Sequence, residues 1–337
     1  MRNAFKSFCA FFAASMAYPL CKSDSGSAVD VWALFKGPKG TDYVYWDTET
    51  PLAASSHDLN STTTGALAAT LQQLWSESTT DYIVWNDEPA GSSDYNFTVG
   101  HTKGIWAWNS GTGDAIILQH SIPLFPFGPS QTPKYTGLGS NAWMYGQHAA
   151  CFHTTVSALN GLADLALLTV PSIYDSRISG DAPATLAALA GGGVRTDPVC
   201  DSTSFSTAGG LNVTYFAKST QWNNELYAAC VAPALQTSLA VESWIRGSAE
   251  GPACSAGGGL DVLDVSGVSY PGGLAFSEYN DHSKWAVSAA SAGDWFCPAD
   301  INRMTTQFAR GGGGYCFQSA DLAASMRAAI TGTDSCS

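Results

Sequence analysis

The chain has 337 residues, of which 45% are hydrophobic and 13% charged, and it contains 34 Gly and 11 Trp. This composition excludes a disordered chain, and the length allows one large domain or two fused halves. The formal charge of −13 at pH 7 argues against a general nucleic-acid binder at neutral pH. Protonation of histidines and carboxylates weakens that objection in an acidic compartment.

The first 17 residues have the pattern of a secretory signal peptide. Arg2 and Lys6 form a basic start, residues 8–12 are mostly apolar, and Ser15-Met16-Ala17 supplies small residues before a cleavage site. No later stretch is long and apolar enough to span a bilayer. The sequence therefore predicts a lysosomal or extracellular protein that follows the secretory pathway and does not sit in a membrane.

The first half of the mature chain predicts strands that lead to a hairpin. Strands are expected at 28–36, 43–46 and 81–85, with a helix over 64–77 because its apolar residues share one face. Strands at 101–108 and 115–121 flank a turn rich in Asn, Gly and Asp. If Trp108 lies opposite Ala115, then Lys103 faces His120, which becomes a third polar group beside His101.

The second half repeats this order in a degenerate form. Expected elements are a helix at 154–165, a strand at 166–170, a helix at 225–239, and strands at 239–244 and 282–288. Asn302 lies 18 residues past Lys284, much as His120 lies 17 past Lys103. We interpret this as an internal repeat joined near 155–170, with halves at 18–160 and 161–337. Residues 311–314, all glycine, are interpreted as a flexible loop.

A His-x-Lys motif marks each half, as His101-Thr102-Lys103 and as His282-Ser283-Lys284. On a strand, residues two apart point to the same face, so each motif would offer an imidazole beside an ammonium group. An imidazole can attack phosphorus or protonate a leaving oxygen, and an ammonium group can stabilise charge on phosphate oxygens. Two motifs at one site would suffice for phosphodiester cleavage without a metal or cofactor.

The cysteines indicate an oxidising compartment. Cys9 leaves with the signal, and an even number remains, which predicts four disulfides with no close pair of the kind zinc sites use. The eight are Cys21, Cys151, Cys200, Cys230, Cys254, Cys297, Cys316 and Cys336. Candidate glycosylation sequons begin at Asn60, Asn96 and Asn212.

These motifs resemble those of the deoxyribonuclease II family, the acid endonucleases of lysosomes and secretions. The resemblance covers nearly the whole mature chain in the right order. The segments that carry it include Asp24-Ser25-Gly26, Phe35-Lys36, Asn86-Asp87-Glu88-Pro89, Gly100-His101-Thr102-Lys103-Gly104, His120-Ser121-Ile122-Pro123, Tyr145-Gly146-Gln147, Asp281-His282-Ser283-Lys284-Trp285 and Asn302-Arg303.

The resemblance implies a phospholipase D-like α/β fold, a pseudo-dimer of two αβα halves with the active site between them. It implies an endonuclease that leaves 3′-phosphate and 5′-hydroxyl ends through a phosphohistidine. It further implies the disulfides Cys21–Cys151, Cys254–Cys336 and Cys297–Cys316, which leave Cys200 and Cys230 as the last pair. Phospholipase D motifs usually carry an Asp five residues after the Lys, whereas this chain has Trp108 and Ala289 there, which argues against a lipid substrate.

The predicted catalytic set is therefore His101, Lys103, His282, Lys284, His120 and Asn302, with Arg303 and Arg310 as candidate DNA contacts. His148 and His153 are not spaced as a metal pair and are assigned structural or surface roles. Two other functions stay open: a secreted non-catalytic DNA-binding or toxin-like protein, and another phosphodiesterase of the same superfamily. The expected partner is DNA, and the protein is expected to be a monomer or a homodimer.

Overall fold

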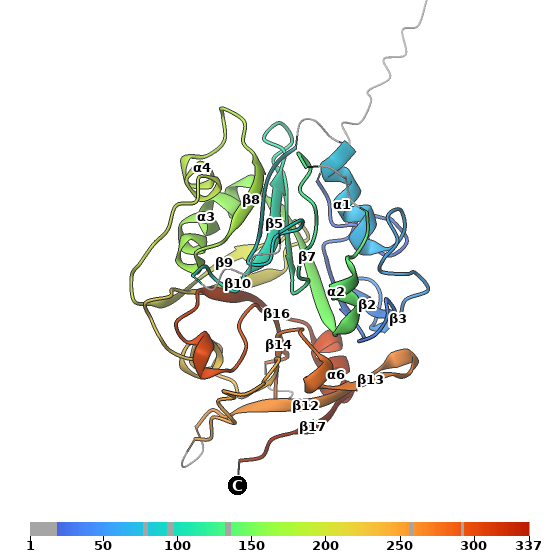
Figure 1. Cartoon of the computed structure of the whole chain (residues 1–337), viewed down its shortest axis with the longest axis vertical. Coiled ribbons are helices and arrows are strands. Elements are labelled where there is room, and N and C mark those ends of the chain that lie inside the picture. Colours follow the sequence, from blue (N-terminus) through green and yellow to red (C-terminus); the bar gives the residue numbers. More distant parts are fainter. Residues whose placement is uncertain are drawn as a thin grey trace, which may run out of the picture.

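Two β-sheets face each other across one hydrophobic core (Figure 1). The computed structural model describes residues 19–76, 80–92, 98–131, 136–255, 259–290 and 293–336. The predicted signal peptide and the sequon at Asn96 lie outside these residues. None of the helices within these ranges is both long and apolar enough to cross a membrane.

The first sheet is antiparallel throughout, with the strand order β3-β2-β1-β7-β6-β5-β4-β8. Its strands are β1 Val31–Lys36, β2 Tyr43–Asp47, β3 Ala53–Ala54, β4 Asp81–Asn86, β5 Lys103–Trp108, β6 Asp114–His120, β7 Gln147–Thr155 and β8 Ile173–Arg177. Trp108 pairs with Ala115, so the predicted hairpin register is confirmed.

The second sheet has the order β13-β12-β11-β14-β15-β16-β10-β9, with β17 added beside β12. Only the β11–β12 pair is parallel among the strand pairs described for this sheet. Its strands are β9 Cys200–Ser206, β10 Asn212–Lys218, β11 Leu239–Glu242, β12 Val262–Tyr270, β13 Leu274–Ser277, β14 Trp285–Ser288, β15 Trp295–Pro298, β16 Gly312–Gln318 and β17 Ile330–Thr333.

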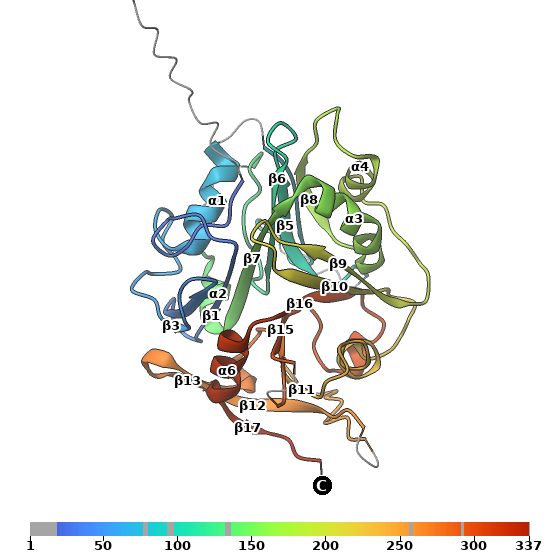
Figure 2. The ribbon, with the colours of Figure 1, turned by 180° about the vertical axis from the view of Figure 1, so that it is seen from behind.

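Helices cover the outer and lateral surfaces, and α1 lies across the first sheet from α3 and α4 (Figures 1 and 2). The α-helices are α1 Ala66–Ser76, α2 Ser140–Met144, α3 Val156–Ala166, α4 Ala184–Ala190, α5 Ala232–Leu235 and α6 Ala320–Ala329. The shorter turns are η1 Leu167–Thr169, η2 Tyr227–Val231, η3 Pro271–Gly273, η4 Glu278–Asn280 and η5 Thr305–Gln307. The predicted mixture of helices with β-sheets is confirmed.

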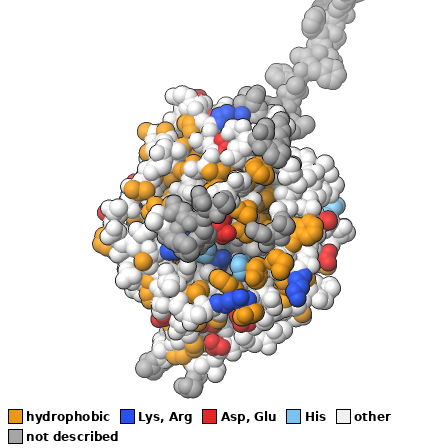
Figure 3. Space-filling view, in the orientation of Figure 1, with side chains coloured by type: hydrophobic (Ala, Val, Ile, Leu, Met, Phe, Trp, Pro, Cys, Tyr) orange, Lys and Arg blue, Asp and Glu red, His pale blue; other side chains and the backbone are white. Residues whose placement is uncertain are grey.

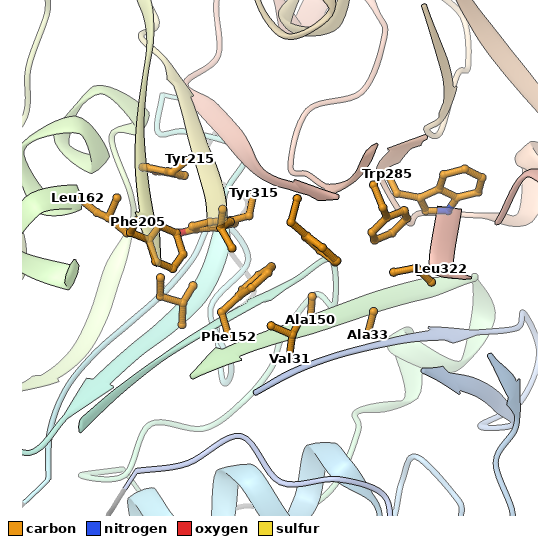
Figure 4. Close-up of a cluster of buried hydrophobic side chains, with 14 of the residues drawn as sticks. Val31, Ala33, Ala150, Phe152, Leu162, Phe205, Tyr215, Trp285, Tyr315 and Leu322 are labelled. Atoms are coloured by element: carbon orange, nitrogen blue, oxygen red, sulfur yellow. The ribbon is translucent and has the colours of Figure 1, made fainter. Parts of the chain in front are cut away.

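Strand β1 shows why the sheets are covered on both faces. Val31, Ala33 and Phe35 point into the core between the sheets, whereas Trp32 and Leu34 pack in a second cluster with α1. The inner cluster joins the two sheets directly (Figure 4), because the Phe35 ring lies 5.8 Å from that of Phe296. Rings of this size contribute several kcal/mol each when buried, so the core favours a fixed docking of the sheets.

Three predicted elements differ from the structure. Residues 166–170 are not a strand, because the Ala- and Leu-rich run continues α3 to Ala166 and then forms η1. The helix expected over 225–239 is shorter: η2 and α5 end at Gln236, whose φ of 53° stops the helix. Residues 312–314 begin the buried strand β16. A Cβ at Gly313 would lie 1.9 Å from the Phe216 carbonyl oxygen, so glycine there permits close strand packing rather than flexibility.

All four implied disulfides are present: Cys21–Cys151, Cys200–Cys230, Cys254–Cys336 and Cys297–Cys316. Each joins residues that belong to the same sheet and its flanking segments. The two sheets are therefore linked to each other by the chain and by noncovalent packing, not by any of these bonds.

Candidate active site

Each His-x-Lys motif lies where the chain enters a central strand. Lys103 is the first residue of β5, and Lys284 directly precedes β14. The predicted strands therefore begin too early, since neither histidine is itself in a strand. Strand alternation does not set the position of either imidazole, and the backbone contacts around each histidine must do so instead.

Those backbone contacts come from the opposite sheet in both cases. The His101 amide donates to the Gly311 carbonyl oxygen at 2.8 Å, just before β16. The His282 amide donates to the Gly146 carbonyl oxygen at 2.9 Å, just before β7. A Cβ at Gly146 would lie 2.4 Å from Oδ1 of Asp281, so glycine lets these two segments approach. Each motif is thus held in place by the other half of the molecule.

The two histidines line the same cavity, which has a volume of about 380 Å³. Lys284 and Asn302 also line it, together with Glu88, Trp244, Met304, Thr306 and Gln307. In Figure 3, histidine, basic and hydrophobic side chains gather near the middle of the face shown. Four of the six predicted catalytic residues therefore meet at one cavity.

Aromatic rings surround His282. The Tyr145 ring stacks on its imidazole, with centroids 3.9 Å apart and an interplanar angle of 12°. The Trp244 ring lies 4.6 Å from the same imidazole at 48°. Burial and the nearby Lys284, Lys103 and Arg246 charges lower the pKa of His282 to about 3. Burial and these charges thus favour the neutral form of the imidazole.

Asp87, directly after β4, is the carboxylate behind the first motif. It is fully buried, forms an ion pair with Lys103, and accepts from Arg310 Nη2 at 3.0 Å. Its Oδ2 lies 4.0 Å from Nε2 of His101. Burial alone would raise the pKa of the Asp87 carboxyl, but Lys103, His101 and Arg310 hold it well below its usual range.

His101 is itself largely buried, with 10% of its side chain exposed. Burial lowers the pKa of its imidazole well below the ordinary value, and Asp87 only partly opposes this effect. Burial therefore favours the neutral form of both imidazoles. A neutral imidazole retains the lone pair that a nucleophile needs.

A chain of hydrogen bonds crosses between the sheets beneath the second motif. Gln119 Nε2 donates to Asp300 Oδ1 at 2.8 Å, and Gln119 Oε1 lies 2.9 Å from His148 Nε2. His148 Nδ1 accepts from the Lys284 amide at 3.2 Å. His148 must therefore carry its proton on Nε2, and it positions the Lys284 backbone as a buried structural residue.

The lysines are not equivalent. Lys284 Nζ donates to the His282 carbonyl oxygen at 2.7 Å and faces the cavity. Burial, with the charge of Lys103, lowers its pKa to about 8, so it remains mainly protonated at acidic pH. Lys103 is paired with Asp87 behind the cavity wall. Of the two motif lysines, Lys284 is therefore the one that lines the cavity.

The remaining predicted residues are buried behind the cavity. His120 accepts from the Ile122 amide through Nδ1 at 3.2 Å, and it is fully buried. Arg303 is also fully buried and pairs with Asp264 at 2.6 Å and with Glu225. The prediction that Arg303 contacts DNA is therefore wrong, because its charge is neutralised inside the second sheet. Arg310 is 5% exposed and supports Asp87, so it is not a surface clamp.

Other predicted positions have varied surroundings. His153 pairs with Asp114 at 3.4 Å, away from the cavity. Asn212 is exposed, and half-buried Asn60 accepts from the Leu138 amide at 2.8 Å. No group of three or more His, Cys, Asp and Glu side chains within the described ranges is arranged to hold a metal.

Sequence reasoning assigned no function to Asp87, Gln119, Trp244 or Asp300. A sequence signal for Asp87 exists, since a carboxylate directly after a predicted strand, beside the motif strand, is a candidate partner for Lys103. Trp244 ends a predicted strand, but nothing in the local pattern indicates that it reaches His282 from another strand.

Asp300→Asn tests the buried carboxyl under the site. Burial raises the pKa of Asp300 from 3.8 to about 6. The protonated carboxyl therefore adds to the free energy of unfolding at low pH, and this contribution is lost as pH rises through 6. Asn does not titrate and keeps an acceptor for Gln119. We expect the unfolding free energy of the variant, relative to the parent, to improve by about 2–3 kcal/mol between pH 4 and pH 8. Urea unfolding at both pH values measures this, with exposed Asp201→Asn as the control; a constant difference would contradict it.

The chain is similar to known proteins along most of its length. A family model described as Deoxyribonuclease II matches residues 20–336. Deoxyribonuclease-2-beta of Rattus norvegicus is 32% identical over 315 residues, covering 88% of this chain and 86% of the relative. Deoxyribonuclease-2 of Caenorhabditis elegans is 32% identical over 90% of each chain. A putative deoxyribonuclease-2 of Burkholderia thailandensis is 32% identical over 89% of each.

These relatives are named as deoxyribonucleases, which are a class of hydrolase. The family model, which matches residues 20–336, spans both sheets and both His-x-Lys motifs. The chain belongs to the deoxyribonuclease II family.

Proposed function

We propose that this protein is an acid endodeoxyribonuclease that cleaves DNA without a metal, through a covalent phosphohistidine. The observation that carries the proposal is that His101 and His282, 181 residues apart in sequence, line one cavity with Lys284. One imidazole attacks phosphorus, and the P–O bond to the 5′-oxygen breaks as the other imidazole protonates that oxygen. Water then attacks phosphorus and breaks the P–N bond, which leaves 3′-phosphate and 5′-hydroxyl ends.

His101 is the proposed nucleophile. The Asp87 carboxylate beside it can stabilise the positive charge that develops on the ring as it attacks, as an acidic partner does for histidines in other hydrolases. His282 is the proposed acid. Burial and the neighbouring cations lower its pKa, so the phosphodiester anion must raise that pKa, by offsetting the charge of Lys284, for His282 to take up its proton.

The two-part domain division and the location of the protein belong to the same proposal. Each motif precedes a central strand of its own sheet, which supports two halves related as a pseudo-dimer. The first sheet continues to Arg177 in β8, so the division placed at 160 falls within α3. The disulfides and the signal-like start support the secretory pathway, in the lysosome or outside the cell.

Nicking of a supercoiled plasmid across pH, with excess chelator, tests the function. We expect activity in the acidic range, near loss above neutrality, and no gain from magnesium or calcium. Added salt screens charge repulsion but does not supply a proton, so it should not restore activity at pH 8. Products should accept a 5′-phosphate from a kinase without prior dephosphorylation. Full activity at pH 8 in chelator, or a strict metal requirement, would overturn the proposal.

A further inference from the structure

One wall of the cavity has a composition that phosphate chemistry does not explain. This wall consists of Trp244, Met304, Asn302 and Gln307, and none of them carries a positive charge. A phosphodiester needs the histidines and Lys284, whereas this wall offers an indole, a thioether and two carboxamides. A second phosphate is a poor occupant of such a surface, and a flat, partly apolar group with polar edges is a good one.

Three side-chain polar atoms of this wall lack partners in the described part of the protein. They are Oδ1 of Asn302, Oε1 of Gln307 and the indole N–H of Trp244, each buried and without a hydrogen bond. Asn302 as a residue is 3% exposed. Buried polar groups are normally satisfied, so three of them around one cavity indicate a ligand with a hydrogen-bonding edge.

The wall is held rigidly by its surroundings. The Thr305 amide donates to the Ser248 carbonyl oxygen at 3.0 Å, and Met304 bridges to Ala249. The guanidinium of Arg246 lies 5.3 Å from the Trp244 ring centroid and 3.4 Å from that of Tyr279. Trp244 thus contacts both this cation and the His282 ring. A fixed wall binds a ligand with little loss of side-chain freedom.

We propose that this wall is a binding site for one nucleobase of the nucleotide next to the scissile phosphate, held unstacked from its neighbours. The proposal rests on the proposed function, since it places the phosphate at the histidines. The base packs against Trp244 and Met304, and its edge faces the carboxamides of Asn302 and Gln307, a pairing that side-chain amides make well. A base inside a duplex has both faces covered, so it must leave the stack to reach this wall.

Dinucleotide substrates with a single phosphodiester isolate this contact. The parent enzyme is given d(TpT) and two analogues in which either the 5′ or the 3′ thymine is replaced by hydrogen. We expect one analogue to lose about tenfold or more in kcat/KM, as removal of a base contact typically costs. Equal cleavage of all three substrates would show that no base is bound.

Trp244→Ala and Gln307→Ala should lower kcat/KM for d(TpT). They should lower it little for the analogue that lacks the bound base, because that analogue has already lost this contact. An equal loss on every substrate would assign these residues a merely structural role and overturn the proposal. Trp244→Phe should restore part of the difference between substrates. Trp143→Ala is the matched control, because Trp143 is 42% exposed and does not line the cavity.

A binding measurement tests the base site independently of the nuclease activity. Calorimetry at pH 5 compares thymidine 3′-phosphate with base-free deoxyribose 3-phosphate. We expect the nucleotide to bind about tenfold more tightly, and Trp244→Ala to remove that difference. If the nucleotide binds more tightly than the base-free phosphate but the protein cleaves no DNA, the base site stands and the nuclease function is rejected. Equal binding of the two, or no binding, would overturn the base site whether or not DNA is cleaved.

Discussion

His101→Ala and His282→Ala are each expected to lower kcat/KM for DNA cleavage by at least about 10³-fold, because loss of either member of a pair that acts as a unit removes most of the catalysis. Both variants should fold. The backbone amides that hold each motif, donated to the Gly311 and Gly146 carbonyl oxygens, do not involve the imidazoles. Both substitutions also remove buried rings whose pKa values are lowered by burial.

Plasmid nicking at pH 5, with circular dichroism and thermal melts, measures the effect of each variant. His153→Ala is the matched control, because its imidazole pairs with Asp114 and lies outside the cavity lining. Losses of only a few-fold in either catalytic variant would reject the two-histidine mechanism. Trapping the enzyme during turnover with labelled DNA, under denaturing alkaline conditions that preserve the P–N bond, would identify the histidine that carries phosphate.

The two motif lysines should differ when each is replaced. Lys284→Ala is expected to lower kcat by about 10²–10³-fold with little change in KM, because it removes a donor placed for charge that develops in the transition state. Lys103→Met should lower kcat comparably and also destabilise the fold by about 3 kcal/mol. It leaves the fully buried Asp87 with Arg310 as its remaining ion-pair partner besides His101.

A triple variant separates these two effects of Lys103. Asp87→Asn, Lys103→Met and Arg310→Met together remove all three charges of the buried cluster, so this variant should recover much of the lost stability without recovering activity. Lys284→Arg is the conservative control for charge at the cavity. If Lys284→Ala raises KM for DNA strongly yet leaves kcat intact at saturation, this lysine only docks the substrate.

Local patterns gave the parts of the fold that depend on neighbours in sequence. The turn after Trp108 carries its own Asn and Gly signals, so the β5–β6 register was predictable. Strand β7 was missed because Gln147–Thr155 mixes small, polar and aromatic residues without clear alternation. It lies between β1 and β6 in the first sheet and is buried on both faces, so no alternation of polar and apolar residues is expected along it.

The sequence predicted the motif residues of the candidate site but not the residues that contact them from other strands. His101, His282, Lys284 and Asn302 could be chosen from sequence and resemblance, and they meet at one cavity. Asp87 and Trp244 enter from other strands, and Arg303 has the same local sequence signal whether it is exposed or paired. The Arg303 guanidinium is held inside the protein by its ion pair with Asp264, 39 residues away. No local pattern reveals this partner.

The reciprocal support of the two motifs makes catalysis a property of the docked sheets. His101 is fixed by a segment of the second half and His282 by a segment of the first. None of the four disulfides connects one sheet to the other. A nascent chain in which only one half has folded would hold one imidazole without its counterpart and without the backbone that aims it. Hydrolytic capacity would then arise in a single late step, when the halves come together.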